Sequence, residues 1–231
     1  MKKKTGAYII KIVAIAASVY GMEKMYNGVE FWTYFTNLSN IFIDIILLIA
    51  LVRDIRIKII PERKQSGNSL WYIVKYVGTI SITITFLVFL FLLAPVQGGI
   101  FQAYFSNGGA SFCVHMITPI LAILDFFIFD TEYLEKWEHA FYAVIPPFVY
   151  VIGIWILGNY FEVRWGGGMM APYNFLNYGA KAGWFGFVPG QLSYESLGIG
   201  VAYCIFAVMI LFLALGECYL WLHKIMRKQR R

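Results

Sequence analysis

Two short polar segments inside long apolar runs carry the side chains most able to do chemistry. Residues 34–40, Tyr-Phe-Thr-Asn-Leu-Ser-Asn, open one run, and residues 115–119, His-Met-Ile-Thr-Pro, open another. Polar groups inside a bilayer are costly, so they usually face the interior of the helix bundle or a functional cavity. A threonine hydroxyl becomes a nucleophile when a base, most often histidine, lies within about 2.6–3.2 Å. The two segments therefore predict Thr36 as a nucleophile and His115 as its base.

The amide side chains of the first segment complete this hypothesis. Asn37 and Asn40 are predicted to donate hydrogen bonds to the oxyanion that forms when a hydroxyl attacks a carbonyl, because such donors are strong in a low-dielectric site. A purely structural role is the alternative. Ser, Thr and Asn commonly connect transmembrane helices by hydrogen bonds, and a lone histidine can be a packed side chain with its hydrogen bonds satisfied.

Each segment continues along its helix as a polar stripe. Two sets of residues share a helix face by their spacing: Thr36, Asn40 and Asp44, and His115, Thr118 and Asp125. Thr36 and His115 are predicted at the same depth, about 5–8 Å below the outer boundary, whereas Asp44 and Asp125 lie about 10–15 Å deeper. The two aspartates are therefore too far away to orient His115. We expect them either to pair with inner polar groups such as Lys11 or to be protonated.

The composition predicts one all-α, polytopic membrane domain over residues 1–231. The chain is 60% hydrophobic and 14% charged, against about 25% charged residues in an average soluble domain. Six apolar stretches approach the roughly 20 residues that a bilayer requires. They are predicted at residues 7–25, 33–53, 71–94, 110–129, 139–158 and 194–222.

The basic residues predict the topology and the surroundings of the chain. The net charge is +6, and the Lys and Arg residues gather at 2–4, 53–64 and 224–231. The positive-inside rule then places both termini in the cytoplasm, in an integral membrane protein that we expect in a bacterial plasma membrane. The basic ends are predicted to contact anionic lipid headgroups and not nucleic acid. The N-terminus also has features of a signal peptide, but we favour an uncleaved first helix. Without that helix, the basic and the weakly charged connections would no longer alternate between the two sides of the membrane.

A long connection between the fifth and sixth stretches is the one unusual loop. Residues 159–193 are rich in Gly, Pro and aromatic residues, which favour turns and the membrane–water interface. We interpret the segment as a cap or lid over the outer face, with a passive interfacial belt as the alternative. Its Arg164 is predicted either to hold a substrate carboxylate through two hydrogen bonds or to anchor at the lipid headgroups.

Several motifs resemble those of a known family. They are the 34–40 segment, His115-x-x-Thr118-Pro119 with Leu124-Asp125 and Phe129-Asp130, and Pro172-Tyr173-x-Phe175-Leu176-Asn177. Their order and the hydropathy of the chain resemble bacterial six-helix relatives of the androgen-induced membrane hydrolases. The resemblance implies a membrane threonine hydrolase that acts on fatty acid esters of hydroxy fatty acids. It assigns the catalytic threonine to Thr36 and the catalytic histidine to His115.

Taken together, these patterns predict an intramembrane lipid ester hydrolase, a threonine esterase that needs no cofactor. Three scattered histidines with no ligand spacing predict no metal site. The alternative is a non-catalytic lipid-binding protein or a small transporter whose polar stripes form a path. Paired helix breaks and an internal repeat, which are typical of transporters, are not evident in the sequence. The substrate is predicted to be a membrane lipid or fatty acid ester, and assembly into a homo-oligomer is left open.

Overall fold

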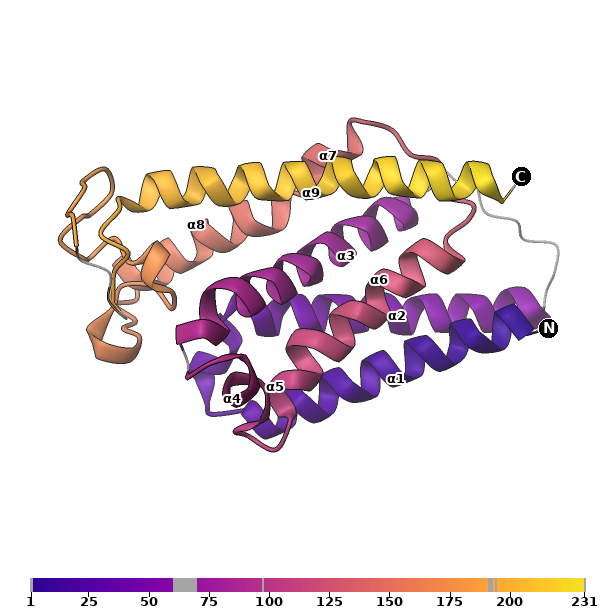
Figure 1. Ribbon diagram of the computed structural model, residues 1–231, viewed down its shortest axis with the longest axis horizontal. Coiled ribbons are helices and arrows are strands. Elements are labelled where there is room, and N and C mark those ends of the chain that lie inside the picture. The colour runs from indigo at the N-terminus through magenta and orange to yellow at the C-terminus, as the bar shows by residue number, and fades with distance from the viewer. Residues whose placement is uncertain (1, 60–69, 97, 191–192, 194, 231) are drawn as a thin grey trace. The chain divides into compact units, whose positions relative to one another are not determined.

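The computed structural model describes residues 2–59, 70–96, 98–190, 193 and 195–230, and within these ranges all regular secondary structure is helical (Figure 1). Six helical segments are long and apolar enough to cross a membrane, which confirms the predicted number. They are Thr5–Met25, Phe35–Arg56, Leu70–Phe91, Ala110–Phe129, His139–Asn159 and Val201–Gln229. The only β-type pairings in the described ranges are two isolated bridges in and beside the predicted cap.

The chain divides into two compact units, which are described separately. The larger unit comprises Met1–Ala143 and Gly216–Arg231, and the smaller unit comprises Val144–Leu215. The larger unit holds α1 (Lys2–Met25), η1 (Val29–Thr33), α2 (Phe35–Ile59), α3 (Leu70–Val88), η2 (Phe89–Leu93), η3 (Ala94–Val96), α4 (Ile100–Phe105), α5 (Ala110–Phe112), η4 (Cys113–Ile117), α6 (Thr118–Phe129) and α7 (His139–Tyr142). The smaller unit holds α8 (Ile145–Asn159), η5 (Gly166–Gly168) and η6 (Asn174–Leu176), and α9 (Val201–Gln229) belongs to both. One domain over 1–231 therefore stays a prediction.

In the larger unit, four helices pack around an apolar core. α1 lies against α2 and α6, and α3 lies against α2 and α6 (Figure 1). Ile43, Leu47 and Ile82 are among the fully buried core residues. At Gly21, a Cβ atom would collide with the backbone oxygen of Ala110, so this glycine allows α1 to approach the fourth span closely. The core therefore fixes the helices that carry both polar segments.

Two spans contain a π-helical turn, and each turn ends two residues before a proline. In η2 the amide of Ala94 donates to the carbonyl of Phe89, and Pro95 follows. In η4 the amide of Thr118 donates to the carbonyl of Cys113, and Pro119 follows. Both bonds run from residue i to i−5, one residue longer than in an α-helix. The sequence interpretation, which saw no paired breaks in the spans, missed these turns.

The sixth span begins later and ends later than its predicted bounds of 194–222. Gly198 has a left-handed φ of 71°, and Ile199 forms an isolated bridge with Phe187. These extended and left-handed residues delay the helix until Val201. At the other end, α9 continues through a basic segment to Gln229, because charged side chains end an apolar run without ending a helix.

Candidate functional site

The two predicted polar segments meet at one buried side chain, Asn40. Its amide nitrogen donates to the carbonyl of Thr36, one turn back on α2, at 2.9 Å, and to the carbonyl of Val114 in η4 at 3.3 Å. Its side-chain oxygen accepts a hydrogen bond of 3.3 Å from Ser18 on α1. We call these four residues, Ser18, Thr36, Asn40 and Val114, the Asn40 junction. It joins three spans at one point.

The π-turn explains why the carbonyl of Val114 needs a side-chain donor. In a regular α-helix the amide of Thr118 would donate to Val114, but here it donates to Cys113. In the π-helical pattern the donor to Val114 would be residue 119, which is a proline and has no amide hydrogen. A freed carbonyl buried in a helix bundle needs another hydrogen-bond partner, and Asn40 supplies it.

The junction brings the second and fourth spans together next to both predicted catalytic residues. The carbonyl oxygens of Thr36 and Val114 share one amide nitrogen, so they lie no farther apart than the sum of its two hydrogen bonds. Thr36 is half-buried in the first turn of α2, and His115 directly follows Val114. The structure places these two helices in contact.

His115 is buried within η4 and stacks on an aromatic ring. Its imidazole lies parallel to the ring of Phe89, with 3.7 Å between centroids and 7° between planes. Phe89 begins the other π-turn, so the two irregular turns face each other through these rings. The Nδ1 atom of His115 is buried and has no hydrogen-bond partner among the described residues. Irregular π-turns are frequent at functional sites.

Asn37 and Asn40 make structural hydrogen bonds of the kind given above as the alternative to an oxyanion role. Both amide hydrogens of Asn40 are occupied by backbone carbonyls, so its predicted oxyanion role would require a break in the junction. Asn37 is buried and donates to the carbonyl of Phe31 in η1 at 2.7 Å. Ser39, on the same turn, pairs with the Thr85 hydroxyl of α3 at 2.7 Å. With the bond from Ser18 to Asn40, the first segment connects α2 to four neighbouring elements, α1, α3, η1 and η4.

The remaining stripe residues lie farther along the same helices. Thr118 is fully buried and its hydroxyl donates to the carbonyl of Ala14 on α1 at 3.2 Å. Asp44 is partly buried, with Ser18 as its polar neighbour and with no ion-pair partner in the part of the chain that the structure describes. Thr118 thus has a helix-connecting role.

Asp125 pairs with Lys11, which is one of its two predicted alternatives, and it belongs to a chain of ion pairs that is buried except at Asp54. The Lys11 ammonium lies 2.7 Å from Asp125 and 3.0 Å from Asp54, and the Lys75 ammonium lies 2.6 Å from Asp125 and 2.7 Å from Asp130. We call these five residues the Lys–Asp network. It joins α1, α2, α3 and the C-terminal end of α6. Burial raises the pKa of Asp130 to about 6 despite the opposing effect of Lys75.

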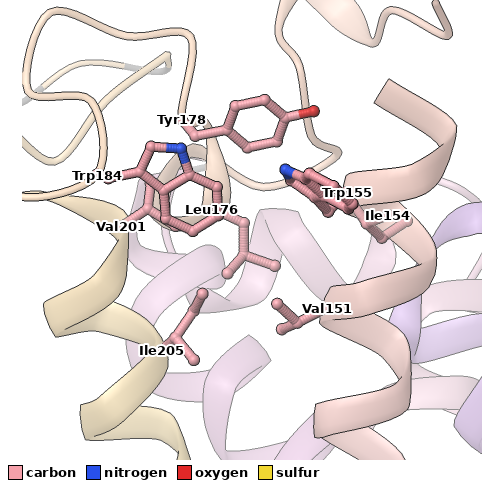
Figure 2. A pocket seen from close by; sticks show the side chains of 8 residues that line it. All are labelled: Val151, Ile154, Trp155, Leu176, Tyr178, Trp184, Val201 and Ile205. Carbon is pink, nitrogen blue, oxygen red and sulfur yellow. The ribbon is translucent and has the colours of Figure 1, made fainter. Parts of the chain in front are cut away.

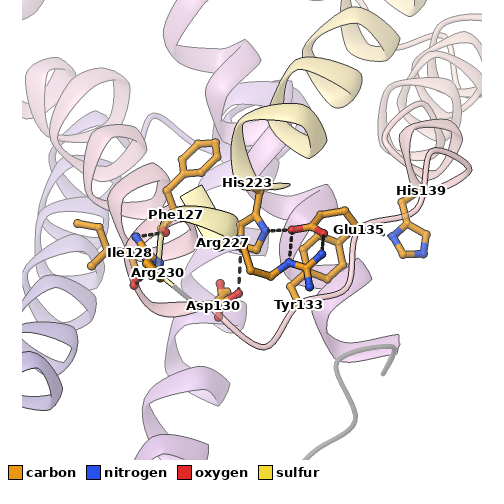
Figure 3. Close-up of polar contacts among 9 residues, drawn as sticks. All are labelled: Phe127, Ile128, Asp130, Tyr133, Glu135, His139, His223, Arg227 and Arg230. Carbon is orange, nitrogen blue, oxygen red and sulfur yellow. Dashed lines mark hydrogen bonds and ion pairs between the residues drawn. The ribbon is translucent and has the colours of Figure 1, made fainter. Parts of the chain in front are cut away.

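A second polar cluster, which sequence reasoning missed, lies beside this network (Figure 3). Glu135 accepts two hydrogen bonds from the Arg227 guanidinium, at 2.6 and 3.0 Å, and lies 2.5 Å from Nδ1 of His223. Nε2 of His223 donates to the carbonyl of Asp130 at 3.0 Å. Burial alone would raise the pKa of Glu135, but the His223 and Arg227 hydrogen bonds outweigh it and hold that pKa below its ordinary value. We call Glu135, His223 and Arg227 the Glu135 cluster.

The sequence contains a signal for this cluster. His223 and Arg227 stand four residues apart and so share a helix face, and Glu135 belongs to an acidic segment. His139 and His223 are both buried, and His139 pairs through Nδ1 with the Tyr133 hydroxyl at 2.6 Å.

The predicted cap folds within the smaller unit. Trp184 stacks on Tyr178, with 5.4 Å between centroids, and Asn159 at the end of α8 donates to the Tyr178 hydroxyl at 2.9 Å. Beside them lies a narrow, partly open apolar crevice (Figure 2). The crevice is lined by Val151, Ile154, Trp155, Leu176, Tyr178, Trp184, Val201 and Ile205.

Arg164 has a local role in this unit. Its guanidinium donates to the carbonyls of Gly158 and Val163, at 2.7 and 2.8 Å, and so caps the last turn of α8. The side chain is exposed, and both of its predicted roles, carboxylate binding and headgroup anchoring, stay predictions. Within the described ranges, no group of three or more His, Cys, Asp or Glu is arranged to hold a metal ion.

Comparisons with protein-family models, with curated proteins and with solved structures found no match to this chain. The functional argument therefore depends on the geometry of the larger unit. There the structure brings the neighbourhoods of Thr36 and His115 together through Asn40, and it places Asp125 in a separate ionic network.

Proposed function

We propose that the chain is an intramembrane lipid ester hydrolase in which Thr36 is the nucleophile and His115 is the general base. One observation carries the proposal: a single buried amide, Asn40, is bonded to the carbonyl of Thr36 and to that of the residue before His115. A nucleophile and its base must be held in a fixed relation, and the junction fixes the two backbones that carry them.

The proposed reaction has two steps. Thr36 Oγ1 attacks the acyl carbonyl of the ester while His115 takes the hydroxyl proton. The ester C–O bond then breaks, and His115 returns that proton to the departing alkoxide, which leaves as an alcohol. In the second step His115 takes a proton from water, the resulting hydroxide attacks the acyl-threonine, and Thr36 recovers its proton as the fatty acid leaves.

The substrate class follows from the surroundings of the pair. The spans are apolar enough to lie in a bilayer, so an ester in reach of Thr36 is carried by a lipid or a fatty acid. The described junction has no formally charged member, which suits a neutral ester. Asn40 positions the two segments in this proposal, and oxyanion support from Asn37 stays part of it.

The test is covalent labelling with a fluorophosphonate lipid probe. Purified wild-type protein should react once per chain, and peptide mapping should find the adduct on Thr36. Thr36→Ala and His115→Ala should both abolish labelling while the proteins stay folded. Ser39→Ala is the matched control, because it removes a hydroxyl from the same turn and should keep most of the labelling.

Two results would overturn the proposal. One is an adduct on a residue other than Thr36. The other is a folded wild type that reacts neither with the lipid probe nor with a short-chain fluorophosphonate, and that hydrolyses no member of a panel of acyl esters. The short-chain fluorophosphonate tests whether the lipid probe is merely too large to reach Thr36.

A second function has one specific observation in its favour. The Lys–Asp network links five ionisable side chains of the larger unit by consecutive ion pairs, and π-turns lie at the end of the third span and within the fourth. Intramembrane ionisable residues often serve proton or ion transport. Proton flux into proteoliposomes that is lost in a Lys75→Met variant shown to remain folded, together with unlabelled Thr36, would favour this transporter-like function over hydrolysis.

A further inference from the structure

Two buried polar atoms near the proposed site lack the hydrogen bonds that such atoms almost always make. They are Nδ1 of His115 and the hydroxyl of Tyr104 on α4, and neither has a partner among the described residues. The side chains are 4% and 2% exposed. The large majority of buried polar atoms in proteins are hydrogen-bonded to protein or to ordered water, so each exception requires an explanation.

Both atoms belong to rings that pack on the same residue. Phe89 stacks on His115 at 3.7 Å and lies 5.1 Å from the Tyr104 ring, centroid to centroid. The imidazole and phenol rings are therefore separated by no more than the sum of these two distances. Burial raises the pKa of the Tyr104 phenol, which keeps its hydrogen available for donation.

The proposed reaction leaves Nδ1 as the hydrogen-bearing nitrogen. If Nε2 accepts the proton of Thr36, the neutral imidazole carries its hydrogen on Nδ1. A catalytic histidine is usually oriented by a third group that accepts this hydrogen. The described residues around Nδ1 offer no direct acceptor. Buried water molecules commonly satisfy such groups, with about three hydrogen bonds each.

We propose that Tyr104 is a positioning residue for His115, and that one buried water molecule connects the His115 Nδ1–H group to the Tyr104 hydroxyl. This inference rests on the proposed function for its catalytic meaning, but the hydrogen-bonded link itself can be tested without activity. In the reaction, the link holds the imidazole in one tautomer and stabilises the imidazolium that forms when Thr36 loses its proton.

The experiment is nitrogen-15 NMR of protein labelled only at histidine. The chain has three histidines, so the spectrum is small and each signal can be assigned by substitution. In wild type we expect His115 as the Nδ1–H tautomer, with a cross-peak between this proton and water. Tyr104→Phe should shift the His115 nitrogen signals well beyond the line width and leave those of His223 unchanged.

Tyr76→Phe is the matched control. The Tyr76 hydroxyl is also buried without a described partner, but its ring packs on Phe126 and Tyr133, away from Phe89. This variant should leave the His115 signals in place. Under the proposed function, Tyr104→Phe should also lower kcat about 10- to 100-fold with little change in KM, as expected for loss of a hydrogen bond to a charged group.

The outcomes separate the two proposals. Unchanged His115 signals in Tyr104→Phe, or a wild-type imidazole with its hydrogen on Nε2, would overturn the link whatever the activity. A clear shift in a protein that never labels at Thr36 would support the link and overturn the hydrolase. If Tyr104→Phe does not fold, the wild-type water cross-peak decides, since its absence also overturns the link.

Discussion

Replacement of Lys75 by methionine should strongly destabilise the larger unit. Lys75 is 2% exposed and its ammonium is the only described partner that joins Asp125 to Asp130, at 2.6 and 2.7 Å. Methionine has a similar length but no charge. The variant would leave three carboxylates of the Lys–Asp network with one lysine.

The magnitude follows from the burial of these charges. Removal of one partner from a buried ion pair typically costs about 3–5 kcal/mol, because the other charge is left without compensation. We expect a loss of this size for Lys75→Met, because Asp125 is completely buried and Lys75 pairs with two carboxylates. The double variant Lys75→Met/Asp130→Asn removes one charge of each sign. It should therefore recover about 0.5–3 kcal/mol relative to the sum of the single variants.

The assay is reversible unfolding in mixed micelles, followed by tryptophan fluorescence. Lys24→Met is the control, because Lys24 is exposed near the end of α1 and its loss should change the free energy of unfolding by less than about 0.5 kcal/mol. A Lys75→Met variant within 1 kcal/mol of wild type, or a strictly additive double variant, would refute the ionic network as a stabilising element.

Three further predictions concern other contacts of the larger unit. Asn40→Leu should lower the free energy of unfolding by about 1–3 kcal/mol in the same assay, because two interhelical hydrogen bonds are lost, while Thr79→Val, which loses only a bond within α3, should cost less than half as much. Gly21→Val should cost about 2 kcal/mol or more, since its side chain would collide with the fourth span, and wild-type stability would show that the helices separate freely. Because the folded pKa of Glu135 is depressed, its contribution to the free energy of unfolding should be fully present above the unfolded pKa of about 4.3 and be lost as pH falls through the lower folded pKa. Glu135→Gln should reduce the dependence of this free energy on pH in the acid range. An unchanged pH dependence would contradict the Arg227 pairing.

The helical architecture could be predicted because one physical requirement sets it. A bilayer needs about 20 apolar residues to be crossed, and the chain presents six such runs. The pairing of Asp125 with Lys11 could also be anticipated, since a charge placed inside a span needs a counter-charge from another span. The late start of α9 could not be predicted, because residues 197–200, Leu-Gly-Ile-Gly, are apolar like the helix that follows them.

The hydrogen-bond pattern within the spans was not accessible from hydropathy. Hydropathy is the same for an α-helical and a π-helical turn, so η2 and η4 leave only an indirect trace, the prolines at 95 and 119. The role of Asn40 depends on that pattern. Its amide looked available for an oxyanion only while the carbonyl of Val114 was assumed to have a donor in its own helix. One displaced hydrogen bond thus converts a predicted catalytic group into a structural one.

The buried polar residues of the six candidate spans and their connections differ in whether all their polar atoms are hydrogen-bonded. Asn40, Ser39 and Thr118 bond to carbonyls or hydroxyls of neighbouring helices, and the Lys–Asp network balances most of its own charge. Within the described ranges, buried hydrogen-bonding atoms outside ion pairs stay unpartnered on Asp44, Tyr76, Tyr104 and His115. Of these four, only Tyr104 and His115 share a packing neighbour, Phe89, and only they lie beside an irregular turn. An unpaired polar atom is costly in an apolar environment. The hydrogen-bonding capacity of His115 Nδ1 and of the Tyr104 hydroxyl, which the described residues do not use, therefore marks this pair for a functional role.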